Sequence, residues 1–274
     1  MRKIKLLALD IDGTLIADMG LPIAQRDRDA IFRARAAGVF ITMATGRILD
    51  VALRWIDALE IDIPVILCNG ADIRDKEKSW FRDSIPLGET RAIMEAYHGS
   101  GQKRYLFSDN RIYCTKEDYH KPLFDKWQQG EEAVFPVVVS DTEEEMYASM
   151  YTDVDKVLVW APDDAHAPAL KQVAQEFAGE FNVVRGEERN VEFNKMGVSK
   201  GSGLRKLTEL LGLSMDEVMA IGDGGNDTEM LRAAGVGVAM ANAMSEAIEA
   251  ADYVTSDVRD CGVAAAIDKF IFGK

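Results

Sequence analysis

The stretch that decides the fold is residues 3–15, which read KIKLLALDIDGTL. The run from Ile4 to Leu9 has the length of a strand and contains neither Gly nor Pro, so it predicts a buried β-strand. Asp10 and Asp12 follow it directly. Two carboxylates this close together either share a proton or bind a cation, and ligands of open α/β sheets lie at the carboxyl ends of the strands. The stretch therefore predicts a divalent-metal and phosphate site, although Asp-x-Asp-Gly-Thr alone also fits an ordinary turn.

The composition is that of an acidic globular protein. The 274 residues suffice for one large domain or two small ones, and 47% of them are hydrophobic. The formal net charge of -14 argues against nucleic acid or an anionic membrane as a partner, because both are bound by basic patches. Three widely spaced cysteines favour the reducing cytoplasm, and we expect neither a signal peptide nor a membrane-spanning segment.

The next segments alternate strand and helix. We expect a helix over residues 22–37 and a strand over residues 39–44, and such a unit with short joints predicts parallel pairing. Thr45 and Gly46 then stand between that strand and the next helix, where free backbone N–H groups bind phosphate. Thr45 alone would be read as a helix cap. With two carboxylates expected on a neighbouring strand, a phosphate-binding hydroxyl is the better interpretation.

The alternation of predicted strands and helices is interrupted in the middle of the chain. A strand at residues 64–68 leads to Asn69 and then to a hairpin at residues 72–83. Asn69 fits either a turn residue or a site residue, and we favour the turn. Residues 84–190 then form short mixed segments that are typical of a separate α+β domain. The α/β alternation returns near residue 197, so the middle domain is expected to be an insertion.

The last third of the chain adds a lysine and a glycine-rich acidic loop. Lys200 falls in the first turn of a predicted helix, where the helix dipole disfavours a cation. Either an anion lies nearby or the lysine is solvated. Residues 222–227 read GDGGND and follow a predicted strand. The three glycines leave little bulk around Asp223, Asn226 and Asp227. A plain turn does not need these three residues together, so we favour a metal-binding loop.

Together these pieces resemble the haloacid dehalogenase (HAD) superfamily and, more narrowly, the Cof-type phosphatases of subfamily IIB. The resemblance rests on DIDGT at residues 10–14, TGR at 45–47, GVSKG at 197–201 and GDGGND at 222–227, in that order along the chain. It spans nearly the whole sequence. It implies an α/β fold in which a Rossmann-like parallel-sheet core domain, residues 1–84 and 192–274, carries an inserted α+β cap domain, residues 85–191.

The resemblance also implies a role for each matching residue. Asp10 matches a nucleophile that forms an aspartyl-phosphate, and Asp12 matches the general acid and base. The other implied catalytic residues are Thr45 and Lys200. The implied phosphate- or substrate-binding residues are Ile11, Thr45, Gly46, Lys200 and Asn226. The implied Mg²⁺ ligands are Asp10, Asp12 through its backbone carbonyl, Asp223 and Asp227.

These roles imply a cytoplasmic Mg²⁺-dependent phosphatase of small phosphorylated metabolites, with sugar phosphates as the first choice. Oxygen ligands without clustered His or Cys favour Mg²⁺ over zinc. A pyridoxal phosphate or nucleotide phosphatase stays open, as does the oligomeric state. A phosphomutase of the same fold uses the same pieces. A non-enzymatic phospho-acceptor module is the weakest alternative. Modules of that class have no second carboxylate at the position of Asp12 and no inserted domain.

Overall fold

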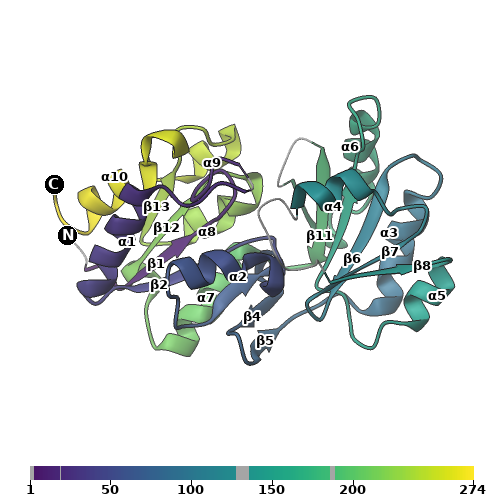
Figure 1. Ribbon diagram of the computed structural model, residues 1–274, viewed down its shortest axis with the longest axis horizontal. Helices are drawn as coiled ribbons and strands as arrows, with labels where there is room; N and C mark the ends of the chain where they lie inside the picture. Colours follow the sequence, from purple (N-terminus) through teal and green to yellow (C-terminus); the bar gives the residue numbers. More distant parts are fainter. Residues whose placement is uncertain (1–2, 19, 128–135, 186–188) are drawn as a thin grey trace.

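The computed structural model describes residues 3–18, 20–127, 136–185 and 189–274. It has two domains that lie side by side, each built around its own sheet (Figure 1). We call the domain with the five-stranded sheet the core domain and the domain with the six-stranded sheet the cap domain. In the described ranges, none of the helices has the length and apolarity that spanning a bilayer requires.

The core domain is a parallel sheet between two layers of helices. The strand order is β14-β13-β12-β1-β2, and neighbouring strands all pair in parallel. The strands are β1 (Leu6–Leu9), β2 (Phe40–Met43), β12 (Val218–Gly222), β13 (Val236–Ala239) and β14 (Tyr253–Val254). The helices are α1 (Gln25–Ala36), α2 (Leu49–Ala58), α7 (Lys200–Leu211), α8 (Thr228–Ala233), α9 (Ser245–Ala250) and α10 (Gly262–Phe270).

The strand β1 is buried on both faces, as its uninterrupted apolar sequence predicts. Leu7 and Leu9 belong to the hydrophobic cluster that contains α1, α2 and α10. Leu6 and Ala8 point to the other face and join the cluster that contains α7, α8 and α9. This double burial fixes β1 between β12 and β2 and sets the position at which Asp10 leaves the sheet.

A short antiparallel sheet extends the core domain toward the cap domain. Its strands are β3 (Val65–Leu67), β4 (Asp72–Arg74) and β5 (Ser79–Arg82), so the predicted hairpin is confirmed. A single parallel bridge between Ala44 and Ile66 ties β3 to the end of β2. The 3-10 turn η1 (Cys68–Gly70) follows β3, and in it Asn69 has a φ of 58°. Asn tolerates this left-handed conformation better than most residues.

The cap domain has the sheet order β10-β11-β9-β6-β7-β8. Its strands are β6 (Lys103–Ser108), β7 (Arg111–Thr115), β8 (Val137–Ser140), β9 (Lys156–Trp160), β10 (Phe181–Val184) and β11 (Asn190–Lys195). Its helices are α3 (Thr90–Ala96), α4 (Lys121–Trp127), α5 (Glu143–Ala148) and α6 (Ala167–Glu176). One face of the sheet packs against α3, α5 and α6. The other face packs against α4 and against Ile48 and Val51 of the core domain.

The predicted architecture, a parallel core sheet with a sheet-containing insertion between β5 and β11, is confirmed, but some elements differ. The strand β7 and the helix α5 were not expected. A two-residue turn with positive φ, Asp109 and Asn110, joins β6 to β7. Such turns are readily recognised in a sequence only when they contain glycine. The strand β11 continues the cap sheet to Lys195, beyond the domain boundary expected after residue 191.

A buried carboxyl group joins the first and last helices of the core domain. Asp27 in α1 is 1% exposed, and its Oδ1 accepts a 2.7 Å hydrogen bond from the backbone N–H of Ala264 in α10. Its Oδ2 has no hydrogen-bond partner among the described residues. Burial raises the pKa of Asp27 to about 6, although the hydrogen bond from Ala264 lowers it in part.

We expect Asp27 to make the protein less stable as the pH rises from about 4 to about 7. The carboxyl group keeps its proton to a higher pH in the folded state than in the unfolded state. Its contribution to the free energy of unfolding is therefore complete below the pKa of the unfolded state, and it is lost as the pH rises through the pKa of the folded state. Asp27→Asn keeps an acceptor for Ala264 and cannot ionise. It should remove on the order of 2 kcal/mol from the pH dependence of the free energy of unfolding.

Urea titrations near both ends of this pH range measure the effect. Asp29→Asn is the matched control, because Asp29 is an exposed residue of the same helix. The prediction is wrong if Asp27→Asn and the wild type lose equal stability between the two pH values.

Candidate active site

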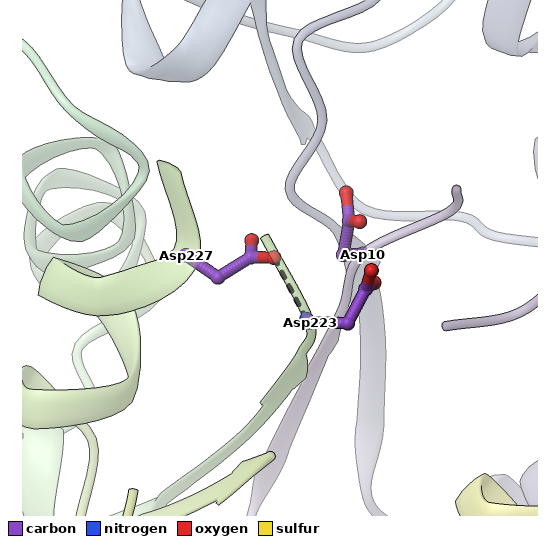
Figure 2. Close-up of side chains that lie close together, drawn as sticks. All are labelled: Asp10, Asp223 and Asp227. Atoms are coloured by element: carbon purple, nitrogen blue, oxygen red, sulfur yellow. Dashed lines mark hydrogen bonds between the residues drawn. The ribbon is translucent and has the colours of Figure 1, made fainter. Parts of the chain in front are cut away.

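Three carboxylates meet at the carboxyl ends of the two central strands of the core sheet. Asp10 follows β1, Asp223 follows β12, and Asp227 ends the 3-10 turn η4 (Gly225–Asp227). Each offers an oxygen within 4.8 Å of the others, and Figure 2 shows Asp10 and Asp223 next to each other at the two strand ends. The Oδ2 of Asp227 accepts hydrogen bonds from the backbone N–H groups of Asp223 and Gly224, at 3.0 and 2.8 Å.

A buried cation lies among these carboxylates. The Nζ of Lys200 donates to Oδ1 of Asp10 at 2.7 Å and to Oδ1 of Asp227 at 2.6 Å, and the lysine is 1% exposed. Burial alone would lower the pKa of Lys200, but the charges of Asp10 and Asp227 outweigh it and raise the pKa above its ordinary value. The two carboxylates therefore account for a lysine in the first turn of α7.

The cluster carries more negative charge than Lys200 neutralises. Burial, and then the charge of Asp227, raise the pKa of Asp10 well above its ordinary value. The same two causes raise the pKa of Asp223 to about 7. Carboxylates whose ionised form is disfavoured in this way are stabilised by a bound cation. The all-oxygen set of Asp10, Asp223 and Asp227 fits a hard divalent ion such as Mg²⁺.

The turn after β1 packs closely against Asp223. The Oγ1 of Thr14 donates a 2.6 Å hydrogen bond to Oδ1 of Asp223. Gly13 has a φ of +78°, and a Cβ at this position would overlap the carboxylate of Asp223. The glycine of the Asp-x-Asp-Gly-Thr motif is thus required both by the backbone conformation and by the close approach of the loop from β12.

Asp12 lies outside the group of three and pairs with Arg47 instead. Arg47 donates from Nε and Nη2 to the two oxygens of Asp12, at 2.8 and 2.6 Å. Its guanidinium group lies 4.5 Å from the centroid of the Trp55 ring in α2. The side chain of Arg47 is 9% exposed and that of Asp12 is 42% exposed. A buried arginine therefore orients a carboxylate that solvent or a ligand can reach.

Asp10, Asp12, Lys200 and Asp223 line a cavity, and Thr45 and Gly46 line it from the end of β2. Thr45 is 1% exposed, and its backbone N–H donates to the carbonyl oxygen of Ile66 at 2.9 Å. Its Oγ1 accepts a 3.2 Å hydrogen bond from the backbone N–H of Arg47. Among the described residues this hydroxyl donates to no acceptor, so its hydrogen is left for a ligand in the cavity.

The cap domain supplies the opposite wall of the cavity. Phe107, Ile112 and Leu158 form its apolar part, and the polar groups from the cap sheet are Lys156, Asn190 and Glu192. Lys156 and Glu192 form an ion pair at 2.7 Å in which the two side chains are only 4% and 8% exposed. The cavity is therefore enclosed by both domains.

The structure brings most of the sequence-predicted residues to this one cavity. Its walls include Asp10, Asp12, Thr45, Gly46, Lys200, Asp223 and Asn226. Asp227 lies behind them, completely buried. Ile11 packs its side chain into the hydrophobic core, which leaves only its main chain to face the site.

Four residues of the site were missed or undervalued in the sequence. Arg47 was noted only as part of a motif, and Asn69 was interpreted as a turn residue. Lys156 and Glu192 received no role, although Glu192 lies between the apolar residues Val191 and Phe193, and Lys156 directly precedes the apolar run at residues 157–160. A charge in such a place is a usable signal, because burying it requires a partner.

Curated relatives match almost the whole chain. The 5-amino-6-(5-phospho-D-ribitylamino)uracil phosphatase YcsE of Bacillus subtilis is 29% identical over 269 residues, which cover 98% of this chain and 96% of the relative. The pyridoxal phosphate phosphatase YbhA of Escherichia coli is 28% identical and covers 92% of this chain and 93% of its own length. These relatives share a phosphatase activity by name and differ in substrate.

Solved structures agree with the sequence matches. A HAD subclass IIB sugar phosphatase is 27% identical, with a TM-score of 0.82 and a coverage of 97% of this chain and 98% of that one. The family model described as haloacid dehalogenase-like hydrolase matches residues 7–267, which include both domains. The chain therefore belongs to the haloacid dehalogenase-like hydrolase family, in its Cof-type subclass IIB.

Proposed function

We propose that this member of the family is a Mg²⁺-dependent phosphatase that hydrolyses small phosphorylated metabolites, with sugar phosphates as the first class to test. The observation that carries the proposal is the position of Asp10. Its buried carboxylate lies 2.7 Å from the Nζ of Lys200, in the wall of a cavity that also presents Thr45 and Asn226. A nucleophile, a cation and neutral hydrogen-bonding groups converge there on one small space.

Asp10 is the proposed nucleophile, and its surroundings address the main obstacle to that role. A carboxylate repels a phosphate dianion, so phosphoryl transfer depends on charge neutralisation and positioning. Lys200 supplies one positive charge. When bound by Asp10, Asp223 and Asp227, with the backbone carbonyl of Asp12 as a further ligand, Mg²⁺ would supply the remaining positive charge. Thr45, Gly46, Asn226 and the main chain at Ile11 are proposed to bind the phosphate oxygens.

Asp12 is the proposed general acid and base. In the first step the carboxylate of Asp10 attacks phosphorus and becomes an aspartyl-phosphate, while the ester oxygen leaves with the proton of Asp12. In the second step ionised Asp12 removes a proton from a water molecule. The water oxygen attacks phosphorus, which releases phosphate and restores Asp10. Arg47 stabilises the ionised form that the second step requires and fixes the direction of the carboxylate.

The cap domain is proposed to select the organic part of the substrate. Its residues line the cavity beside the proposed phosphate site, where the organic part of a small ester would lie. The polar groups of Asn190, Lys156 and Glu192 offer partners for hydroxyl groups, which supports sugar phosphates. Phe107 and Leu158 offer apolar contact, so pyridoxal phosphate and 5-amino-6-(5-phospho-D-ribitylamino)uracil belong in the same test panel, as the names of the relatives suggest.

The first experiment measures phosphate release from this panel with and without Mg²⁺, for the wild type and Asp10→Asn. We expect Mg²⁺-dependent release, and a loss on the order of 10³-fold or more in Asp10→Asn, because no nucleophile remains. Release by Asp10→Asn at the wild-type rate would contradict the role of Asp10, once mass spectrometry has excluded deamidation of the asparagine. Isomerised sugar phosphates with little free phosphate would instead identify a mutase.

A second experiment separates the two steps through Asp12. In Asp12→Asn, p-nitrophenyl phosphate should still phosphorylate Asp10, because its leaving group departs without a proton. Dephosphorylation should then stall. We expect a burst of about one p-nitrophenol per enzyme followed by slow turnover, and a phosphorylated Asp10 in acid-quenched protein. Steady turnover of Asp12→Asn at the wild-type rate, without a burst, would exclude the proposed role of Asp12.

A third experiment tests the metal site through stability. Without metal, the raised pKa of Asp223, about 7, makes the folded state lose stability as the pH rises through this value. Mg²⁺ competes with protons for the same oxygens, so it should raise the unfolding temperature more at high pH than at low pH. At about 100 times its Kd the ion should add about 2.7 kcal/mol to the free energy of unfolding. Asp223→Asn should weaken this response, and an unchanged response would rule out Asp223 as a ligand.

A further inference from the structure

The buried ion pair of the cap domain reaches into the core domain. Besides its bond to Glu192, Nζ of Lys156 donates a 2.7 Å hydrogen bond to the carbonyl oxygen of Gly46. The ammonium group also lies 4.6 Å from the centroid of the Phe107 ring. Lys156 stands in β9 and Glu192 in the adjacent strand β11, so the cap sheet fixes both side chains.

The bond to Gly46 fixes a peptide group of the phosphate-binding loop. The carbonyl oxygen of Gly46 and the N–H of Arg47 belong to the same planar unit. Lys156 binds the carbonyl side, and the N–H on the other side donates to Oγ1 of Thr45 at 3.2 Å. A rotation of this peptide group would break both bonds. Lys156 thereby helps to hold the N–H group that donates to Oγ1 of Thr45.

The other oxygen of Glu192 starts a second connection. Its Oε2 accepts a 2.6 Å hydrogen bond from Nδ2 of Asn69, and Oδ1 of Asn69 accepts a 3.1 Å hydrogen bond from Nδ2 of Asn226. The backbone N–H of Asn69 also donates to the carbonyl oxygen of Thr45 at 3.0 Å. The cap ion pair is thus linked to Thr45 and to Asn226, the two neutral side chains proposed to bind phosphate.

We propose that Lys156 and Glu192 are positioning residues, which complete the phosphate-binding site of the core domain when the cap domain lies against it. The inference rests on the proposed phosphatase function. It assigns the pair a role toward the phosphate group, which every substrate shares, rather than toward the organic part of one substrate. Closure of the cap domain and formation of the phosphate site become one event.

A merely structural role does not account for charges at these positions. Burying two ions costs desolvation energy, and apolar residues of similar volume often replace such a pair without loss of stability. Other hydrogen bonds also hold the two domains together. Asn194 of β11, for example, donates to the carbonyl oxygens of Cys68 and Asp155 at 2.9 and 2.8 Å. What the ion pair adds is a direction for the groups that it binds.

The test is the binding of inorganic phosphate in the presence of Mg²⁺, followed by calorimetry, in the wild type and in the double variant Lys156→Met/Glu192→Leu. Phosphate has no organic part, so contacts of the cap domain with a leaving group cannot influence the result. We expect Kd to rise about tenfold, the loss expected for one charge-assisted hydrogen bond, while the unfolding temperature stays near that of the wild type. The isosteric Glu192→Gln serves as a second variant should the double variant fold poorly.

The matched control is Lys195→Met. It removes an ion pair of 2.6 Å between the cap domain and Asp83 of the core domain, whose two side chains are 45% and 38% exposed. Its Kd for phosphate should equal that of the wild type. An unchanged Kd in both test variants, with or without a higher KM for an organic ester, would overturn the inference and leave the phosphatase proposal intact. Failure of the wild type itself to bind phosphate would overturn both.

Discussion

The site depends on the repulsion among three carboxylates that the fold forces together. Asp10 and Asp223 leave adjacent parallel strands at the same edge, and Asp227 is held nearby by backbone N–H groups. Burial, and then the charge of Asp227 that Lys200 offsets only in part, raise the pKa values of Asp10 and Asp223. Hydrophobic burial of β1 on both faces holds Asp10 in this unfavourable place. The same uncompensated charge creates affinity for a cation.

A second layer of polar contacts supports this cluster from outside. Arg47 holds Asp12, and Lys156 and Glu192 hold the main chain of Gly46 and the amide of Asn69 next to the proposed phosphate position. These groups come from the core domain and the cap domain respectively. In the proposed mechanism the three carboxylates and Lys200 belong to the core domain, whereas the alignment of the neutral hydrogen-bonding groups depends on both domains. Such supporting contacts decide how accurately a site is held.

Most of the core domain and the acidic cluster were predictable from sequence, because their signals are local. An apolar run followed by Asp10 and Asp12, or a glycine-rich loop around Asp223, carries its meaning within a few residues. The cap contribution was not predictable in this way. Lys156 and Glu192 gain a role only through contacts with Gly46 and Asn69, more than a hundred residues away. No pattern in a single sequence encodes such a contact, and β7 was missed for the related reason that pairing with β6 defines it.

The order of strands in the core sheet has a consequence for how the chain is made. β1 ends at Leu9, whereas its parallel partner β12 begins only at Val218, so β1 is synthesised long before β12. Until then one edge of β1 has no neighbour, and the whole cap domain is synthesised in between. Non-local pairing of this kind folds slowly and exposes apolar strands meanwhile. During synthesis β1 therefore lacks one of its sheet partners until the cap domain has been made, and Asp10 and Asp223 come together only after that.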